Sequence, residues 1–233
     1  MSWDDERAED YDELEWVHRD LDLVVHAAAP MSTDHVLDVG TGTGVAAKAI
    51  APYVQRVVGM DVSTAMLDRA ECPGVEFVQG DIMTANLKDR FDVAILRMVL
   101  HHLEQPHTAL GRVSDLFLED DGRIVIVEGV PPCGCRDWYE KMFALKEERC
   151  TYSPDDLVTI ISKRYDVKSV SLYQQMNMSL NNWLEKTGAK NAKSIWDMHV
   201  SAPQYVKEAY NMRLVNGDII MDWQTCIVVG VKE

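Results

Sequence analysis

Three glycines at alternate positions follow a short apolar run, in the stretch Val36-Leu37-Asp38-Val39-Gly40-Thr41-Gly42-Thr43-Gly44. Glycine lets the backbone turn sharply, and it lets a ligand approach main-chain N–H groups that a Cβ would cover. A periodic stretch begins at Val45, and a helix starting there would direct unpaired N–H groups and its positive dipole end toward that ligand. The pattern predicts a nucleotide-type site at the first strand–helix turn of an α/β sheet.

The spacing of the glycines distinguishes between kinds of nucleotide site. The dinucleotide fingerprint has its third glycine three residues after the second. Here that position holds Val45, and the third glycine comes early, at Gly44. The Lys-Ser or Lys-Thr pair of a phosphate-binding loop does not follow either. The spacing therefore disfavours an NAD-dependent oxidoreductase and excludes a phosphate-binding loop.

A carboxylate ends the next apolar segment. Asp61 follows residues 56–60 and comes 17 residues after Gly44. At the end of a second strand, its two oxygens could accept hydrogen bonds from both hydroxyls of a ribose. Taken alone, Asp61 could also be a helix cap, a role that Ser63 or Thr64 could fill as well.

A second carboxylate follows the third apolar segment, residues 75–78. Asp81 could accept a hydrogen bond from an adenine amino group, and Ile82 could pack on the ring. Taken alone, Asp81 could be a turn residue. A fourth apolar segment, residues 92–97, then leads to a pair of adjacent histidines.

In this order and spacing, the segments resemble the class I S-adenosylmethionine-dependent methyltransferases. The resemblance covers about residues 30 to 130 specifically. Within the class, the chain is most similar to small-molecule methyltransferases like those of ubiquinone and menaquinone biosynthesis. The resemblance implies S-adenosyl-L-methionine as the cofactor. The cofactor-binding residues that it implies are Asp38, Gly40, Thr41, Gly42, Gly44, Asp61, Val62, Asp81, Ile82 and Arg97.

Arg97 departs from the family pattern, which often has a small polar residue at this position. Its backbone is expected to contact the cofactor. Its guanidinium is expected to meet a carboxylate that belongs to the protein or to the substrate.

Methyl transfer depends mainly on positioning, a dry pocket and, in some enzymes, a base. His101 and His102 are the candidate bases, because an imidazole can take up a proton near neutral pH. The alternative is that both histidines pack or cap a helix that begins there. Glu128 ends the fifth strand on the same rim, where it could orient a histidine, contact the substrate or face solvent.

Strands and helices alternate after residue 30, which predicts parallel βαβ units. The expected strands are residues 35–39, 56–60, 75–78, 92–97, 123–129, 167–173 and 225–231. The fold class is therefore α/β, and the resemblance implies a Rossmann-like, seven-stranded, mostly parallel sheet. In that fold the last strand is antiparallel and lies between the fifth and the sixth, and helices cover both faces.

The chain is expected to form a single methyltransferase domain, residues 1–233. Residues 1–30 would be a helical lid, residues 31–132 the cofactor-binding core, and residues 133–233 the substrate side. The substrate side would include a helix at 136–150 and a largely helical insertion at 176–212. The expected substrate-binding residues are Tyr11, Trp16, Trp138, Tyr139, Phe143, Trp183 and His199.

Composition narrows the range of partners. The net charge is −15, and residues 1–20 hold nine acids against two arginines. Such a balance disfavours nucleic acid as substrate, because nucleic-acid enzymes need a basic footprint. No membrane span or signal peptide is expected, and the five cysteines suit reduced thiols in a cytoplasmic protein. No metal site is expected, and the sequence leaves the oligomeric state open.

The sequence thus predicts S-adenosylmethionine-dependent methyl transfer to a small molecule with an apolar or aromatic acceptor. It leaves open whether carbon, oxygen or nitrogen receives the methyl group. One alternative is a catalytically silent subunit that binds the cofactor for regulation. A less favoured alternative is methylation of a thiol or metalloid, with Cys133, Cys135 and Cys150 as the reactive groups.

Overall fold

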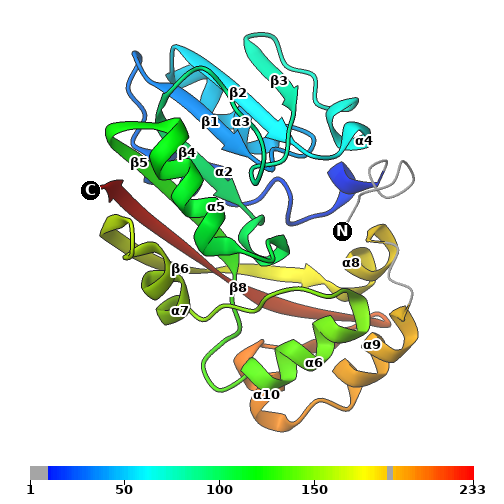
Figure 1. Ribbon diagram of the computed structural model, residues 1–233. Coiled ribbons are helices and arrows are strands. Elements are labelled where there is room, and N and C mark those ends of the chain that lie inside the picture. The colour runs from blue at the N-terminus through cyan, green and yellow to red at the C-terminus, as the bar shows by residue number, and fades with distance from the viewer. Residues whose placement is uncertain (1–9, 188–190) are drawn as a thin grey trace.

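A computed structural model describes residues 10–187 and 191–233 of the protein (Figure 1). Its centre is an eight-stranded sheet in the order β3-β2-β1-β4-β5-β8-β6, and the short strand β7 pairs with β8 off this path. The strands are β1 (His35–Val39), β2 (Arg56–Asp61), β3 (Val75–Gln79), β4 (Phe91–Arg97), β5 (Leu118–Gly129), β6 (Tyr165–Ser179), β7 (Arg213–Val215) and β8 (Asp218–Lys232).

The direction of the strands confirms the predicted topology. Strands β1 to β5 pair in parallel, whereas β8 runs antiparallel to both of its neighbours, β5 and β6. The chain order reverses beside β1, which lies between β2 and β4. In open α/β sheets, ligands bind outside the carboxyl ends of the strands at such a reversal.

The helices lie around this sheet. They are α2 (Leu21–Ala28), α3 (Val45–Ile50), α4 (Thr64–Leu67), α5 (Pro106–Arg112), α6 (Arg136–Lys146), α7 (Pro154–Ile161), α8 (Leu180–Lys186), α9 (Ala192–Val200) and α10 (Gln204–Ala209). Four short helical turns are η1 (Tyr11–Glu13), η2 (Ala51–Tyr53), η3 (Leu100–His102) and η4 (Val113–Phe117).

Alternation along each strand gives the sheet two apolar faces. Leu37 and Ile126 point to the face that α5 and α7 cover, and Val36 and Val127 point to the face that α2 and α3 cover. Helix α2 therefore belongs to the core. This finding corrects the prediction that residues up to 30 form a helical lid, because Val24 and Ala28 are buried against the sheet.

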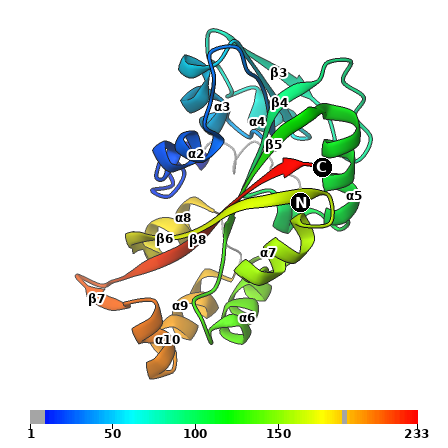
Figure 2. The ribbon, with the colours of Figure 1, turned by 90° about the vertical axis from the view of Figure 1, so that its left-hand side faces the viewer.

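Strands β6 and β8 are each 15 residues long and extend well beyond the rest of the sheet (Figure 2). The extension pairs Met178 with Met221 and Ser179 with Ile220. The predicted insertion at 176–212 therefore begins as a strand, and only its later part is helical. Asn216 and Gly217 both have positive φ and form the turn that joins β7 to β8 in a hairpin.

The helices α6, α8, α9 and α10 gather beside this extension (Figures 1 and 2). They share a third apolar cluster, which is separate from the two faces of the sheet and holds Trp138, Trp183 and Ile195. Within residues 10–187 and 191–233, no helix is long and apolar enough to cross a membrane.

Candidate active site

A cavity lies at the carboxyl ends of β1, β2 and β4, where the chain order reverses, and it continues to α6, α9 and the extended part of β8. The structure brings most of the predicted site residues to its wall. Those that line it are Tyr11, Trp16, Gly40, Gly42, Asp61, Val62, Asp81, Ile82, Arg97, His101, His102, Trp138, Tyr139, Phe143, Trp183 and His199. Four predicted residues do not line it: Asp38, Thr41, Gly44 and Glu128.

The glycine loop after β1 turns tightly at the edge of the cavity. Gly40 and Gly42 have φ of 67° and 58°, which side chains disfavour. The N–H of Gly40 donates to the carbonyl of Met60 at 2.7 Å, which holds the loop against β2. A Cβ on Gly40 would lie 2.4 Å from Cγ2 of Val99, so this position has no room for a side chain.

Asp38 acts behind the loop. One of its oxygens accepts from the Thr41 hydroxyl at 2.6 Å and from the N–H of Ala47 at 3.2 Å. It thereby ties β1, the glycine loop and the start of α3 together. Burial raises the pKa of Asp38 to about 6. Asp38 and Thr41 therefore shape the loop from behind and do not line the cavity.

Asp61 reaches the cavity from the end of β2. Its two oxygens accept from the N–H of Gly42 at 2.8 Å and from the N–H of Ser63 at 2.9 Å. Each carboxylate oxygen can accept more than one hydrogen bond, so both keep capacity for a ligand. Ser63 caps α4 with its own hydroxyl, which frees Asp61 from the capping role considered above.

The adenine side of the predicted site lies after β3. Asp81 is exposed and accepts from the N–H of Met83 at 2.8 Å, while Ile82 is 5% exposed and packs into the core beside the cavity. The carboxylate and the apolar side chain thus lie next to each other on the wall of the cavity, as the sequence predicts.

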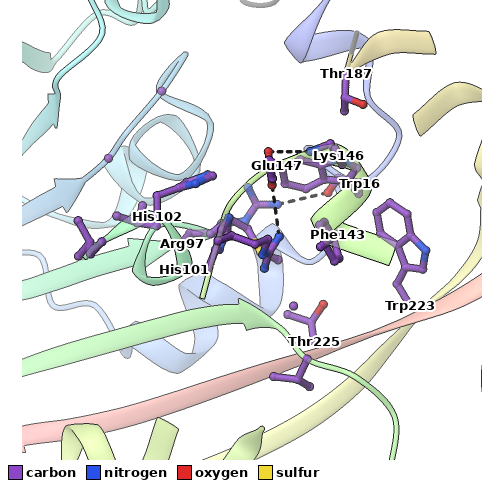
Figure 3. Close-up of a pocket in the computed structure, with 18 of the residues that line it drawn as sticks. Trp16, Arg97, His101, His102, Phe143, Lys146, Glu147, Thr187, Trp223 and Thr225 are labelled. Atoms are coloured by element: carbon purple, nitrogen blue, oxygen red, sulfur yellow. Dashed lines mark hydrogen bonds and ion pairs between the residues drawn. The ribbon is translucent and has the colours of Figure 1, made fainter. Parts of the chain in front are cut away.

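The guanidinium of Arg97 forms its hydrogen bonds with other groups of the protein. It donates to the carbonyl of Val17 at 2.9 Å and to Asp20 at 3.1 Å, and it lies over the ring of Trp16 (Figure 3). The carboxylate that the sequence predicts for Arg97 therefore comes from the protein. Asp20 also accepts from Tyr173 and from Gln175, so it joins β4 to β6.

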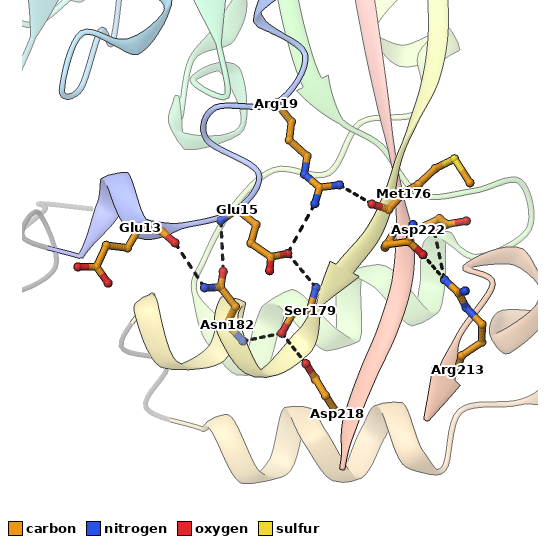
Figure 4. A network of polar contacts seen from close by, with 10 residues as sticks. Glu13, Glu15, Arg19, Met176, Ser179, Asn182, Arg213, Asp218 and Asp222 are labelled. Carbon is orange, nitrogen blue, oxygen red and sulfur yellow. Dashed lines mark hydrogen bonds and ion pairs between the residues drawn. The ribbon is translucent and has the colours of Figure 1, made fainter. Parts of the chain in front are cut away.

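The N-terminal segment, residues 10–20, is held on its other side by β6 and α8 (Figure 4). The N–H of Glu15 donates to Asn182 at 3.2 Å, and Arg19 donates to the carbonyl of Met176. Leu14 and Val17 are fully buried. Buried side chains and the ion pair between Arg97 and Asp20 thus anchor residues 10–20 to the rest of the protein. Residues 1–9 lie outside the described residues.

His101 and Glu128 form a buried pair. Nδ1 of His101 lies 2.7 Å from Oε2 of Glu128, and the N–H of His101 donates to the other oxygen at 3.3 Å. Burial lowers the pKa of His101 well below its usual value and raises the pKa of Glu128 to about 7. Glu128 is fully buried behind His101, so it can orient the imidazole but does not line the cavity.

The ring of His102 lies tilted by 52° against the ring of His101, with centroids 4.0 Å apart. Burial, together with the neighbouring imidazole, lowers the pKa of His102 to about 3. Both histidines are therefore neutral near pH 7, and both line the cavity.

Aromatic rings enclose the far end of the cavity. Phe143 lies edge-on to Trp183 at 5.7 Å between centroids, and Trp183 lies edge-on to Trp223 at 5.5 Å. Trp138 contacts His199 in the same edge-on manner at 4.9 Å. Trp223 was not among the sequence predictions, because it lies on β8 within a strand whose start was placed at residue 225.

Three charged residues of the cavity also escaped sequence reasoning. Helix α6 ends at Lys146, and Glu147 has the extended backbone that follows it. Lys146 and Glu147 pair at 3.1 Å (Figure 3), and Arg149 lies 3.7 Å from the other oxygen of Glu147. The prediction of a helix through residue 150 is wrong here.

Buried polar atoms without a hydrogen-bond partner gather at the cavity. Among the described residues eight such side-chain atoms occur, and seven of them belong to residues that line it. They come from Trp16, Arg97, Trp138, Arg149, Gln175, His199 and Tyr210. Since buried polar groups are nearly always paired, a molecule bound in the cavity is expected to satisfy some of them.

The cysteines of the thiol alternative lie apart from the cavity lining. Cys133 and Cys150 are exposed and Cys135 is buried in the third apolar cluster. None of these three lines the cavity. Nothing in their placement favours chemistry at sulfur.

Comparison with known proteins shows which family the glycine loop and the strands around it resemble. Residues 37–126 match the family model described as "Methyltransferase domain". Residues 37–126 are therefore a methyltransferase domain, and the sheet that contains them has the class I methyltransferase fold. An uncharacterized methyltransferase of Mycobacterium tuberculosis is 34% identical over 116 residues, which are 48% of this chain and 58% of that protein. A demethylmenaquinone methyltransferase of Clavibacter sepedonicus is 30% identical over 168 residues, 67% of this chain and 62% of that protein.

The matched part therefore spans little more than half the length of these curated relatives. The fold agrees over a longer stretch. The crystal structure of a putative methyltransferase from Bacillus halodurans superposes with a TM-score of 0.81 and covers 91% of this chain and 98% of that one, at 20% identity. At such identity the match supports the shared methyltransferase fold alone.

Proposed function

We propose that this protein transfers a methyl group from S-adenosyl-L-methionine to a small molecule. The rest of that molecule, apart from the atom that receives the methyl group, is apolar or aromatic. The observation that carries the proposal is the continuity of one cavity. The glycine loop and Asp61 line one end of it, aromatic rings line the other, and His101 lies between them.

The residues at the first end fit the cofactor. Gly40 and Gly42 expose backbone that side chains would cover, Asp61 has acceptor capacity for ribose hydroxyls, and Asp81 and Ile82 suit an adenine ring. When bound there, S-adenosyl-L-methionine would supply an activated methyl group.

The residues at the other end of the cavity suit a small acceptor molecule, and their apolar surfaces would exclude water from it. Trp138, Phe143, Trp183 and Trp223 all line this part of the cavity, and each has most of its surface buried or packed against the third apolar cluster. Aromatic walls of this kind hold flat apolar molecules at close range. The enclosed shape and the net charge of −15 both disfavour a nucleic-acid substrate.

The histidine pair supports a proton-accepting role. When Glu128 is ionised it accepts from Nδ1–H of His101, which leaves Nε2 without a proton and able to take one from the acceptor. Glu128 orients the base from behind, in the manner of a base held by a third group. Arg97 and the N-terminal segment would close the cavity on the side of the cofactor.

Two measurements test the proposal. Titration calorimetry with S-adenosylmethionine and with NAD should give binding to the first and none to the second; the opposite result would overturn it. Incubation with S-adenosylmethionine labelled in its methyl group, together with candidate acceptors, should then yield labelled product. Binding of cofactor without turnover on any acceptor would favour the alternative of a silent, cofactor-binding subunit.

A further inference from the structure

Arg149 is a buried cation with unused hydrogen-bonding capacity. Its side chain is 8% exposed and lines the cavity. Its Nε atom is buried without a hydrogen-bond partner among the described residues, and the nearest carboxylate oxygen, on Glu147, lies 3.7 Å from a terminal nitrogen. That separation is too long for a hydrogen bond. A guanidinium carries five N–H donors and stays charged, so burying it without good acceptors is costly.

The neighbours of Arg149 fix its orientation but leave its donors available. The guanidinium lies over the ring of Phe143 at 4.1 Å and near that of Tyr139 at 5.9 Å. Stacking on a ring holds the plane of the group and leaves its edge, where the N–H donors are, to face another molecule. Glu147 is closer to Lys146, at 3.1 Å, than to Arg149.

The backbone around Arg149 holds it beside the candidate base. The N–H of Cys150 donates to the carbonyl of His101 at 2.9 Å, which ties the segment after α6 to η3. The charge of Arg149 is also close enough to lower the pKa of both His101 and Glu128. A group bound to Arg149 would therefore lie next to the histidines.

The other arginine of the cavity provides a contrast. Arg97 donates to Val17 and Asp20, so its charge is used inside the protein. In the described part of the chain, no carboxylate lies within hydrogen-bonding distance of Nη1 of Arg149. In a chain of net charge −15, a buried arginine left in this state is unexpected unless an anion binds it.

We propose that Arg149 binds a carboxylate of the methyl acceptor, so that the substrate is a small aromatic or apolar monocarboxylic acid. A planar carboxylate matches the fork of a guanidinium, and the walls around Arg149 are rings that suit an apolar body. This inference rests on the proposed function, since it names the class of acceptor for the same cavity.

Matched acids and amides test the inference by calorimetry. The protein, saturated with S-adenosylhomocysteine, would be titrated with benzoate, phenylacetate and indole-3-acetate and with the corresponding amides. We expect at least one acid to bind roughly 10- to 100-fold more tightly than its amide, because the amide lacks the charge. Arg149→Met should remove this preference and Arg149→Lys should keep part of it.

The affinity for S-adenosylhomocysteine separates this inference from the proposed function. Arg149→Met should leave that affinity unchanged, and failure of the wild-type protein to bind S-adenosylhomocysteine would instead refute the proposed function. Arg164→Met is a matched control, because Arg164 pairs with Asp115 on the surface with a side chain 51% exposed. The inference is overturned if no acid binds, if acids and amides bind equally, or if Arg149→Met keeps the preference for the acid.

Discussion

Nδ1 of His101 lies 2.7 Å from Oε2 of Glu128, although the two residues are 27 positions apart in the chain. His101 follows β4 and Glu128 lies near the end of β5, and these strands are parallel neighbours. The pair is buried, so neither group is readily charged. The proton between the two atoms therefore decides whether the outer nitrogen of His101 can act as a base.

The first prediction is a fall in rate below about pH 7. Burial raises the pKa of Glu128 to about 7. Below that pH, protonated Glu128 donates to Nδ1, so the histidine proton sits on Nε2 and the base is lost. Above it, ionised Glu128 accepts from Nδ1–H and Nε2 is free. The single-turnover rate at saturating cofactor should drop by roughly tenfold per pH unit on the acid side.

Glu128→Gln is the matched control for this profile. Its amide does not titrate, so the acid limb near pH 7 should disappear and the rate at pH 8 should be lower than that of wild type. A wild-type rate that stays flat from pH 6 to 8 would show that the pair does not control the chemical step.

The second prediction distinguishes the two histidines. His101→Ala should lower the single-turnover rate by roughly 100- to 10,000-fold, because it removes the base that Glu128 orients. His102→Ala should have a smaller effect, since no described carboxylate is hydrogen-bonded to its ring. Cofactor affinity should be nearly unchanged in both. If both variants keep the wild-type rate on the true acceptor, the enzyme works by positioning alone.

The third prediction concerns the cofactor. Asp61→Ala should weaken S-adenosylmethionine binding by roughly 1.5–3 kcal/mol through the loss of charge-assisted hydrogen bonds. The protein should stay folded, which circular dichroism would verify. Asp89→Ala is a suitable control, because this carboxylate is half-exposed and pairs with Arg56 at the opposite end of β2. Equal affinities of wild type and Asp61→Ala would remove the ribose assignment.

Gly42→Val should weaken cofactor binding further. Its Cβ would lie 3.1 Å from Cε of Met66, and its φ of 58° disfavours any side chain, a β-branched one most of all. A valine that leaves cofactor affinity intact would show that the ligand does not approach the loop here.

The fourth prediction concerns the N-terminal segment. Leu14 is fully buried in the third apolar cluster. Leu14→Ala should therefore lower the free energy of unfolding by about 2–5 kcal/mol, as measured by urea denaturation. Leu23→Ala is the matched control: this leucine is 44% exposed, and its loss should cost less than about 0.5 kcal/mol.

Deletion of the N-terminal segment is expected to affect stability as well as turnover. From sequence, deleting residues 1–20 would be expected to cost turnover far more than stability. Because Leu14 and Val17 are buried, the same deletion is now expected to lower stability as well. A Leu14→Ala variant as stable as wild type would show that Leu14 does not anchor the segment, which would then be a loosely held lid.

The sequence by itself determined the end of the cavity that the glycine loop lines. Gly40 and Gly42 lie in the loop after β1, Asp61 ends β2, and Asp81 comes two residues after β3. The carboxyl ends of parallel strands meet at one edge of a sheet. Local order in the chain was therefore enough to place these residues around one pocket.

The tertiary structure decided the other end of the cavity, where Arg149 and the aromatic rings lie. Arg149 faces the cavity because α6 ends at Lys146, Glu147 has an extended backbone, and Cys150 is hydrogen-bonded to His101 far away in the chain. Neither glycine nor proline marks that helix end, so periodicity carried the predicted helix on to residue 150. The partner of Arg97 was equally hidden, because Asp20 reaches it only when the N-terminal segment packs across β4 and β6. Such contacts depend on the packing of segments distant in sequence, and local residue patterns do not encode them.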